Sequence, residues 1–159
     1  MVFSIVALAL GYAVVVGKSA LLSSDIPTQL RQNVIFSIMS MAHELRQTAP
    51  AKTNITEGTS SSAITFKTPY DSDSDGDVVD KIGNVEWGQD ITYALDGSGQ
   101  LSRTYAGTTS VIAPNISSLE FSRPAGQDEI LQIDIIVQKK DGQGKVYQDA
   151  EQAIIKMRN

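Results

Sequence analysis

The hydrophobic pattern begins with a long stretch that lacks charge. Residues 1–17 have no charged side chain, and Lys18 is the only charged residue in MVFSIVALALGYAVVVGKSALL, residues 1–22. As a helix this stretch would be about 33 Å long, close to the roughly 30 Å thickness of a bilayer's hydrocarbon core. The pattern therefore predicts a membrane-spanning segment. A cleaved signal peptide, a simple tether and a buried helix of a soluble fold are the alternatives.

Small side chains are frequent in the same stretch. Ala13 and Gly17 are four residues apart, a spacing that lets two helices approach closely in apolar surroundings. We therefore predict helix–helix packing, with Ala13 and Gly17 at the closest approach. The residues predicted to be buried in this packing are Val6, Leu8, Leu10, Val14, Val15 and Val16.

An amphipathic pattern follows Lys18. Apolar residues recur three or four positions apart, which is typical of one face of a helix. Proline at position 27 is tolerated in a first turn but would bend a continuous helix, and Ala49-Pro50 should end it near Thr48. We predict one long, bent helix that begins with the apolar stretch. Its second half presents the stripe Leu30, Val34, Ile38, Met41 and Leu45.

The remaining chain alternates short β-type runs with turn residues. Asp96–Gly99 and Asp141–Gly144 contain Asp-Gly, which favours tight hairpin turns, so the strands they join should be antiparallel. The clearest strand alternates Leu131, Ile133, Ile135 and Val137 with mostly polar neighbours. The predicted strands are 62–68, 90–95, 100–105, 117–123, 129–138 and 150–157.

These elements predict an α+β fold. The second half of the helix should lay its apolar stripe on one face of an antiparallel sheet, and the first half should project from it. We accordingly divide the chain into residues 1–24, a transmembrane or filament-core half-helix, and residues 25–159, a head domain.

Composition narrows the possible chemistry. The net charge is −5, and no basic cluster is larger than Lys139-Lys140, so nucleic acid is a poor partner. Cysteine is absent, which excludes disulfides and thiolate ligands, and the single histidine, His43, excludes histidine-rich metal sites.

Several segments, taken in order, resemble the type IV pilins and the pseudopilins of type II secretion. The helix QLRQNVIFSIMSMAHELRQTAP resembles that of minor pilins of the W and J type, with Glu44–Thr48 in the place of their "DLRQA"-like end. AITFKTPYDSDSDGD, ITYALDGSGQLSR and the closing IIKMRN resemble the sheet of the same group. The resemblance covers most of the chain and implies a pilin-like fold with no enzymatic activity and no required cofactor.

The start of the chain differs from that family. Pilins begin, after a basic leader cut behind glycine, with a segment like "FTLIE", whose fifth-residue glutamate matters for assembly, whereas Ile5 is fifth here. VFSIVALALG resembles the continuation of such a segment, so we expect several residues to precede Met1. Lys18 alone would favour a cytoplasmic sheet, and a basic leader would reverse that preference.

The segment DSDSDGD is the sharpest local chemical signal. Alternating acids followed by glycine match half of an EF-type calcium loop, in which positions 1, 3, 5 and 7 supply oxygen ligands. The candidate calcium ligands are Asp71, Asp73, Asp75 and Asp77. The twelfth position is Ile82 instead of glutamate, so Asp80 or Glu86 would have to substitute. A solvated acidic loop without an ion is the alternative.

The resemblance implies a structural subunit of a pilus or of a secretion pseudopilus. Its partners would be other pilin or pseudopilin subunits. Before assembly it would cross the bacterial inner membrane once, with the head in the periplasm, and afterwards it would lie in the filament. Two alternatives are a membrane-anchored, calcium-dependent adhesion or binding domain and an anchored periplasmic enzyme. No catalytic constellation in the sequence supports the enzyme.

Overall fold

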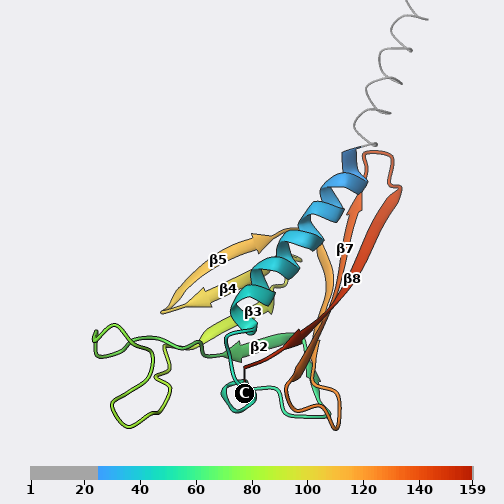
Figure 1. Cartoon of the computed structure of the whole chain (residues 1–159). Helices are drawn as coiled ribbons and strands as arrows, with labels where there is room; N and C mark the ends of the chain where they lie inside the picture. Colours follow the sequence, from blue (N-terminus) through green and yellow to red (C-terminus); the bar gives the residue numbers. More distant parts are fainter. Residues whose placement is uncertain (1–24, 159) are drawn as a thin grey trace, which may run out of the picture.

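The computed structural model describes residues 25–158 of the chain. Within that range one α-helix lies against two antiparallel sheets (Figure 1). The predicted α+β class is confirmed. The prediction of a single sheet is wrong, because the strands divide into two groups of four.

The helix covers residues 25–45 and buries one stripe of its surface. Ile26, Leu30, Val34, Met41 and Leu45 are buried, as the helical period requires. Ser37 is buried instead of Ile38, which packs only partly against the core. The hydroxyl of Ser37 donates to the Asn33 carbonyl at 2.7 Å, so its burial leaves no unpaired donor.

The helix ends a turn earlier than the sequence predicts. The backbone N–H of Gln47 bonds to the Glu44 carbonyl at 3.0 Å, a tightened last turn. Thr48 is buried, and its carbonyl accepts the N–H of Arg158 at 2.8 Å. The C-terminal segment thus takes the bond that another helical turn would have used.

Each sheet has four antiparallel strands. One sheet has the order β1-β6-β7-β8, and the other has the order β2-β3-β4-β5. A short 3₁₀ turn, Pro50–Lys52, connects the helix to the first strands. The strands are β1 Ser60–Ser61, β2 Ala63–Phe66, β3 Ile91–Leu95, β4 Leu101–Tyr105, β5 Thr108–Ala113, β6 Ile116–Ser122, β7 Ile130–Lys140 and β8 Val146–Lys156.

Two strands were missed by the sequence pattern. β5 pairs with β4 at the edge of its sheet and exposes its first four residues, so it has no hydrophobic alternation to recognise. β1 has only two residues, which pair with the end of β6. Both strands depend on their partners for hydrogen bonds, so local sequence gives little sign of them.

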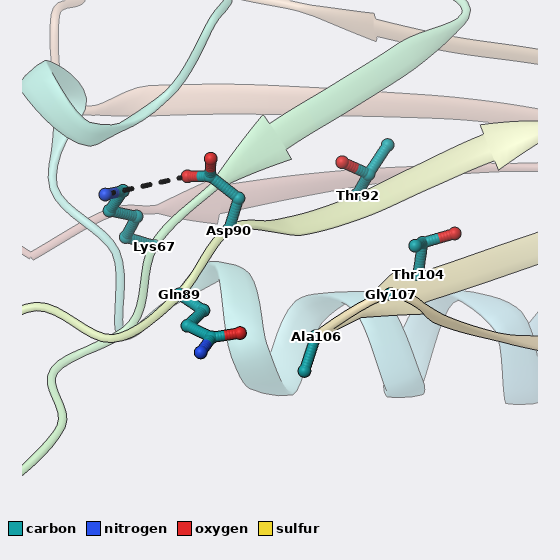
Figure 2. A pocket seen from close by; sticks show the side chains of 7 residues that line it. All are labelled: Lys67, Gln89, Asp90, Thr92, Thr104, Ala106 and Gly107. Atoms are coloured by element: carbon teal, nitrogen blue, oxygen red, sulfur yellow. Dashed lines mark ion pairs between the residues drawn. The ribbon is translucent and has the colours of Figure 1, made fainter.

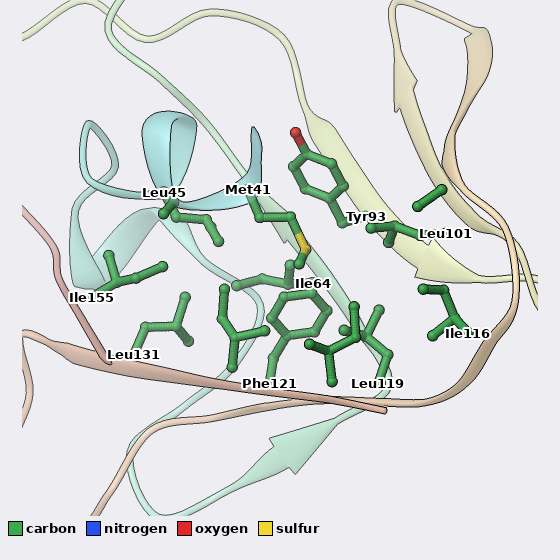
Figure 3. Packing of buried hydrophobic residues seen from close by; sticks show 14 of the residues in the cluster. Met41, Leu45, Ile64, Tyr93, Leu101, Ile116, Leu119, Phe121, Leu131 and Ile155 are labelled. Carbon is green, nitrogen blue, oxygen red and sulfur yellow. The ribbon is translucent and has the colours of Figure 1, made fainter. Parts of the chain in front are cut away.

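Side chains from the helix and from both sheets share one core. Met41 and Leu45 of the helix lie close to Phe121 and Leu131 of one sheet and to Tyr93 of the other (Figure 3). The predicted alternation in β7 is confirmed, since Leu131, Ile133, Ile135 and Val137 are all buried. Phe66 and Tyr93 stack with their ring centroids 6.0 Å apart.

Both predicted hairpin turns are confirmed. Asp96 and Asp141 each accept backbone N–H groups two and four residues ahead, at 2.8–2.9 Å, which closes the turns between β3 and β4 and between β7 and β8. Gly99 has a φ of 72°, and a Cβ atom there would lie 2.9 Å from the Ile116 carbonyl oxygen. The turn therefore requires glycine on two counts.

Candidate functional site

The segment between β2 and β3 folds back on itself through backbone bonds. Pro69 pairs with Trp87, and Val79 pairs with Val85. The N–H of Tyr70 bonds to the Glu86 carbonyl at 3.1 Å. Residues 69–87 therefore form an excursion that brings Glu86 beside the first acids of DSDSDGD.

Three carboxylates converge in this excursion. Asp71, Asp73 and Glu86 each offer an oxygen, and these oxygens all lie within 4.8 Å of one another. Calcium holds its ligands at 2.3–2.6 Å, so two of its ligands are at most about 5 Å apart. The spacing of the three oxygens is compatible with a shared calcium ion.

The structure thus groups two of the four predicted ligands with a residue outside the motif. Asp75 and Asp77 do not belong to this group of three. Asp75 instead accepts the N–H of Asp77 at 3.0 Å, an interaction within the turn. Glu86 lies outside the motif, and only the backbone pairing of the excursion brings it close.

Donors from neighbouring residues of the excursion hold two of these acids, Asp71 and Glu86, in place. The N–H of Gly76 donates to Asp71 Oδ2 at 2.9 Å, and both N–H and Oγ of Ser72 donate to Glu86 Oε2, at 2.6 and 2.7 Å. The second oxygen of Asp71, Oδ1, is buried and has no hydrogen-bond donor among residues 25–158. A buried carboxylate oxygen without a partner is costly, and a cation would supply one.

The electrostatics of the loop also favour a cation. Desolvation raises the pKa of Asp73, and the negative charges of Asp75, Glu86 and Asp71 raise it further, against the lowering effect of the Asp75 N–H. The backbone N–H of Asn84 is the main cause that lowers the pKa of Asp80. Asp80 is therefore held as a charged turn acceptor, while Asp73 is the acid that its neighbours destabilise.

Calcium is expected to stabilise the protein through this loop. With a dissociation constant in the range of extracellular calcium modules, about 10 mM calcium should raise the melting temperature by about 5 °C. Differential scanning calorimetry of the full chain in calcium, in magnesium and in chelator measures this shift. The double variant Asp71→Asn/Glu86→Gln should lose it, and Asp149→Asn should keep it. Equal melting temperatures in calcium and in chelator would show that the loop is solvated and binds no calcium.

A second polar cluster, which sequence reasoning missed, fixes the helix to a sheet. Glu44 accepts Arg103 Nη2 at 2.8 Å and the hydroxyl of Tyr93 at 3.0 Å. Burial and the negative charge of Glu44 raise the pKa of Tyr93, and the hydrogen bond to Glu44 raises that of Arg103. These shifts keep the Tyr93 hydroxyl and the Arg103 guanidinium protonated as donors to Glu44. The sequence signal for this cluster was Arg103, an arginine at a position that strand alternation predicts to face inward.

An open polar groove of about 520 Å³ lies where β3 begins and β4 ends (Figure 2). Lys67 and Asp90, at 3.8 Å, are the charged residues of its lining. The hydroxyls of Thr92 and Thr104 are occupied by cross-strand hydrogen bonds to Thr65 and Thr109, at 2.9 and 2.8 Å. The polar groups of this groove therefore have structural roles in the sheet.

The predicted helix-packing residues lie outside the range that the structure describes. They are Val6, Leu8, Leu10, Ala13, Val14, Val15, Val16 and Gly17. Within residues 25–158, no helix combines the length and the apolar character needed to cross a membrane.

The function must be inferred from this chain's own residues. No protein-family model matches the chain, and no curated protein or solved structure matches it either.

Proposed function

We propose that the protein is a structural subunit of a filament of the type IV pilus or type II secretion kind. It assembles through its N-terminal apolar helix and has no enzymatic role. The observation that carries this proposal is the helix of residues 25–45, which presents apolar side chains on two opposite sides. One side is buried in the head, and the other faces outward.

The outward side forms an apolar ridge of Ile35, Phe36 and Met39. Their exposed fractions are 44%, 58% and 66%. At 100° per residue these positions lie opposite the buried stripe. An open groove of about 660 Å³ runs beside the ridge and is lined in part by Phe36, Met39 and Ile112. Clustered exposed apolar side chains on a polar protein are typical of an interaction surface.

Chain continuity connects this ridge to the apolar stretch of the sequence. Two residues, Ser23 and Ser24, lie between Leu22 and Asp25, so the Cα atoms of Leu22 and Asp25 are at most about 11 Å apart. The described part of the helix therefore begins close along the chain to the end of the stretch. The outward ridge and that stretch would offer neighbouring subunits two apolar surfaces along one chain segment, with the exposed polar residues Thr28, Gln29 and Gln32 between them.

The mechanism requires the apolar stretch to change its surroundings. Before assembly, the lipid of the inner membrane surrounds it, and the head lies in the periplasm. During assembly, the same segments of other pilin or pseudopilin subunits replace the lipid. Small residues favour this exchange because helices gain close contact that lipid tails do not provide.

The ridge supplies a direct test of the proposal. The variant Phe36→Ser/Met39→Ser should lower the amount of full-length subunit in sheared filaments about tenfold. The parent chain gains free energy when a neighbouring subunit buries the two apolar side chains, and serine at these positions removes that gain. Its melting temperature should change little, since both side chains are already exposed in the subunit. Immunoblotting of the filament and membrane fractions measures incorporation.

The matched control removes apolar groups elsewhere. Ile82→Ser/Ile154→Ser changes two side chains that are also exposed but are not on the helix. This variant should assemble like the parent chain. If the ridge variant assembled as well as the parent chain, the ridge would have no role in contacts between subunits.

A calcium-dependent adhesion or binding domain is the second candidate function. The convergence of Asp71, Asp73 and Glu86 favours it. In that case residues 1–22 would serve only as an anchor, and an unrelated spanning helix in their place would preserve calcium-dependent binding. The filament proposal expects assembly to be lost after the same exchange.

A further inference from the structure

The end of β7 and the turn that follows it contain the densest group of basic residues in residues 25–158. Lys139, Lys140 and Lys145 lie within seven residues of one another in a chain of net charge −5. Lys140 and Lys145 are exposed, and Lys139 is half-buried. We call Lys139–Lys145 the basic hairpin tip.

The basic hairpin tip lies beside the first turn of the described helix (Figure 1). Lys139 Nζ donates to Gln29 Oε1 at 3.1 Å, which fixes this neighbourhood. Gln29 is four residues, or about 6 Å of helix, from Asp25, and Asp25 is at most about 11 Å from Leu22. The tip therefore lies close to the point where the apolar stretch of the sequence ends.

The tip also contains one acid, Asp141, whose negative charge is partly compensated by backbone N–H groups of the turn. The Asp141 carboxylate accepts the N–H groups of Gln143 and Lys145, both at 2.9 Å. Asp134 and Asp149 are the nearest acids in the sequence on either side of the tip, and Asp25 is the first described residue of the neighbouring helix. The acidic excursion of residues 69–87 lies at the other end of the head (Figure 1). The charge of the head is thus polarised, with positive charge toward the apolar stretch.

Side chains next to the tip suit a membrane surface. Tyr147 is half-buried, and Lys145 Nζ lies 4.8 Å from the centroid of its ring. Val146 is exposed beside it. Tyrosine and lysine with an adjacent aliphatic residue are typical of the layer where hydrocarbon meets headgroups.

We propose that the basic hairpin tip binds the anionic headgroups of the bilayer that holds residues 1–22. This inference rests on the proposed function, because that function places the apolar stretch in a membrane. Lysines attract anionic lipids over about one Debye length, about 8–10 Å at physiological salt. The contact holds the head upright on the membrane and is released when the subunit moves into a filament.

A fluorophore at the tip tests this contact. The chain has no cysteine, so Gln143→Cys gives a single labelling site on an exposed turn residue. The full chain is reconstituted in vesicles of phosphatidylcholine alone or with phosphatidylglycerol, each with a quencher on the lipid headgroup. Quenching should be about twofold stronger in the anionic vesicles and should lose this excess in about 1 M salt, where the Debye length is about 3 Å.

Matched lysine variants locate the effect. Lys139→Gln/Lys140→Gln/Lys145→Gln should abolish the excess quenching. Lys52→Gln/Lys81→Gln/Lys156→Gln removes the same charge elsewhere on the head and should retain it. Circular dichroism of both variants checks that the sheets are intact.

The outcomes separate this inference from the proposed function. Failure of the chain to float with vesicles would overturn both. Flotation with equal quenching in the two lipid mixtures, or with excess quenching that survives the tip variant, would overturn the lipid contact alone.

Discussion

Replacing Arg123 with leucine is expected to lower the free energy of unfolding by about 3–5 kcal/mol. Arg123 is only 5% exposed and lies at the end of β6. Its guanidinium donates to the carbonyls of Ile55 at 2.8 Å, Pro50 at 3.3 Å and Asp128 at 2.7 Å. One side chain thus joins the segment after the helix to the connection between β6 and β7.

The expected loss comes mainly from these carbonyls. Leucine would remove the guanidinium from all three carbonyls. The Thr53 hydroxyl lies 3.2 Å from the Pro50 and Ile55 carbonyls but can donate to only one of them at a time. Each buried acceptor left unpaired costs about 1–3 kcal/mol. The Arg123 guanidinium also pairs with the Asp128 carboxylate, but that side chain is 68% exposed, so solvent screens most of the attraction. Arg123 Nε is buried with no partner in the described part of the chain, which offsets a little of the loss.

Urea denaturation of the full chain in a mild detergent measures this change. Arg46→Leu, an identical substitution at an exposed position, should stay within about 0.5 kcal/mol of the parent. A loss below about 1 kcal/mol for Arg123→Leu would show that water replaces the guanidinium at these carbonyls.

Replacing Ala13 with leucine is expected to abolish incorporation into filaments while the head stays folded. Ala13 belongs to the sequence pattern of residues 1–22, outside the described range, and is four residues before Gly17. Leucine at a small-xxx-small position holds packed helices apart and removes close contact along the seam. Lipid accommodates leucine readily, so insertion into the membrane should be unchanged.

Two variants control for the size and the place of this substitution. Ala13→Gly keeps the residue small and should assemble. Ala20→Leu adds the same side chain outside the Ala13/Gly17 pair and should assemble as well. The measurements are the subunit content of sheared filaments and the calcium-free melting temperature of the head. Normal incorporation of Ala13→Leu would contradict close packing at this seam.

Much of the local structure could be predicted from the sequence. The β7 alternation and both Asp-Gly turns depend on residues adjacent in the chain, so they are visible in a short window. The helical stripe was predicted nearly in full, with Ile38 and Ser37 exchanged at its edge. Which of these two residues is buried depends on how the helix is rotated against the sheets. A periodic pattern predicts that rotation only to within one residue position.

The candidate sites depended more on the tertiary structure. DSDSDGD indicated an acidic loop, but Glu86 joins Asp71 and Asp73 only because the excursion folds back on itself. Glu44 and Arg103 are 59 residues apart and meet across the packing of helix on sheet. Arg103 and Arg123 each occupy a position that the alternation of a strand predicts to face inward. An inward-facing arginine indicates that a polar partner is close, but the sequence does not identify that partner.

The sequence by itself determined the uncharged start, the amphipathic helix, the α+β class and the acidic motif. Each depends on the order of neighbouring residues, which local periodicity and turn chemistry translate into structure. Only the tertiary structure decided that the strands form two sheets, that Phe36 and Met39 face outward, and that the lysines of the β7–β8 turn lie beside Gln29. The physical reason is that long-range pairing depends on the total fit of many weak contacts, and no single segment encodes that fit.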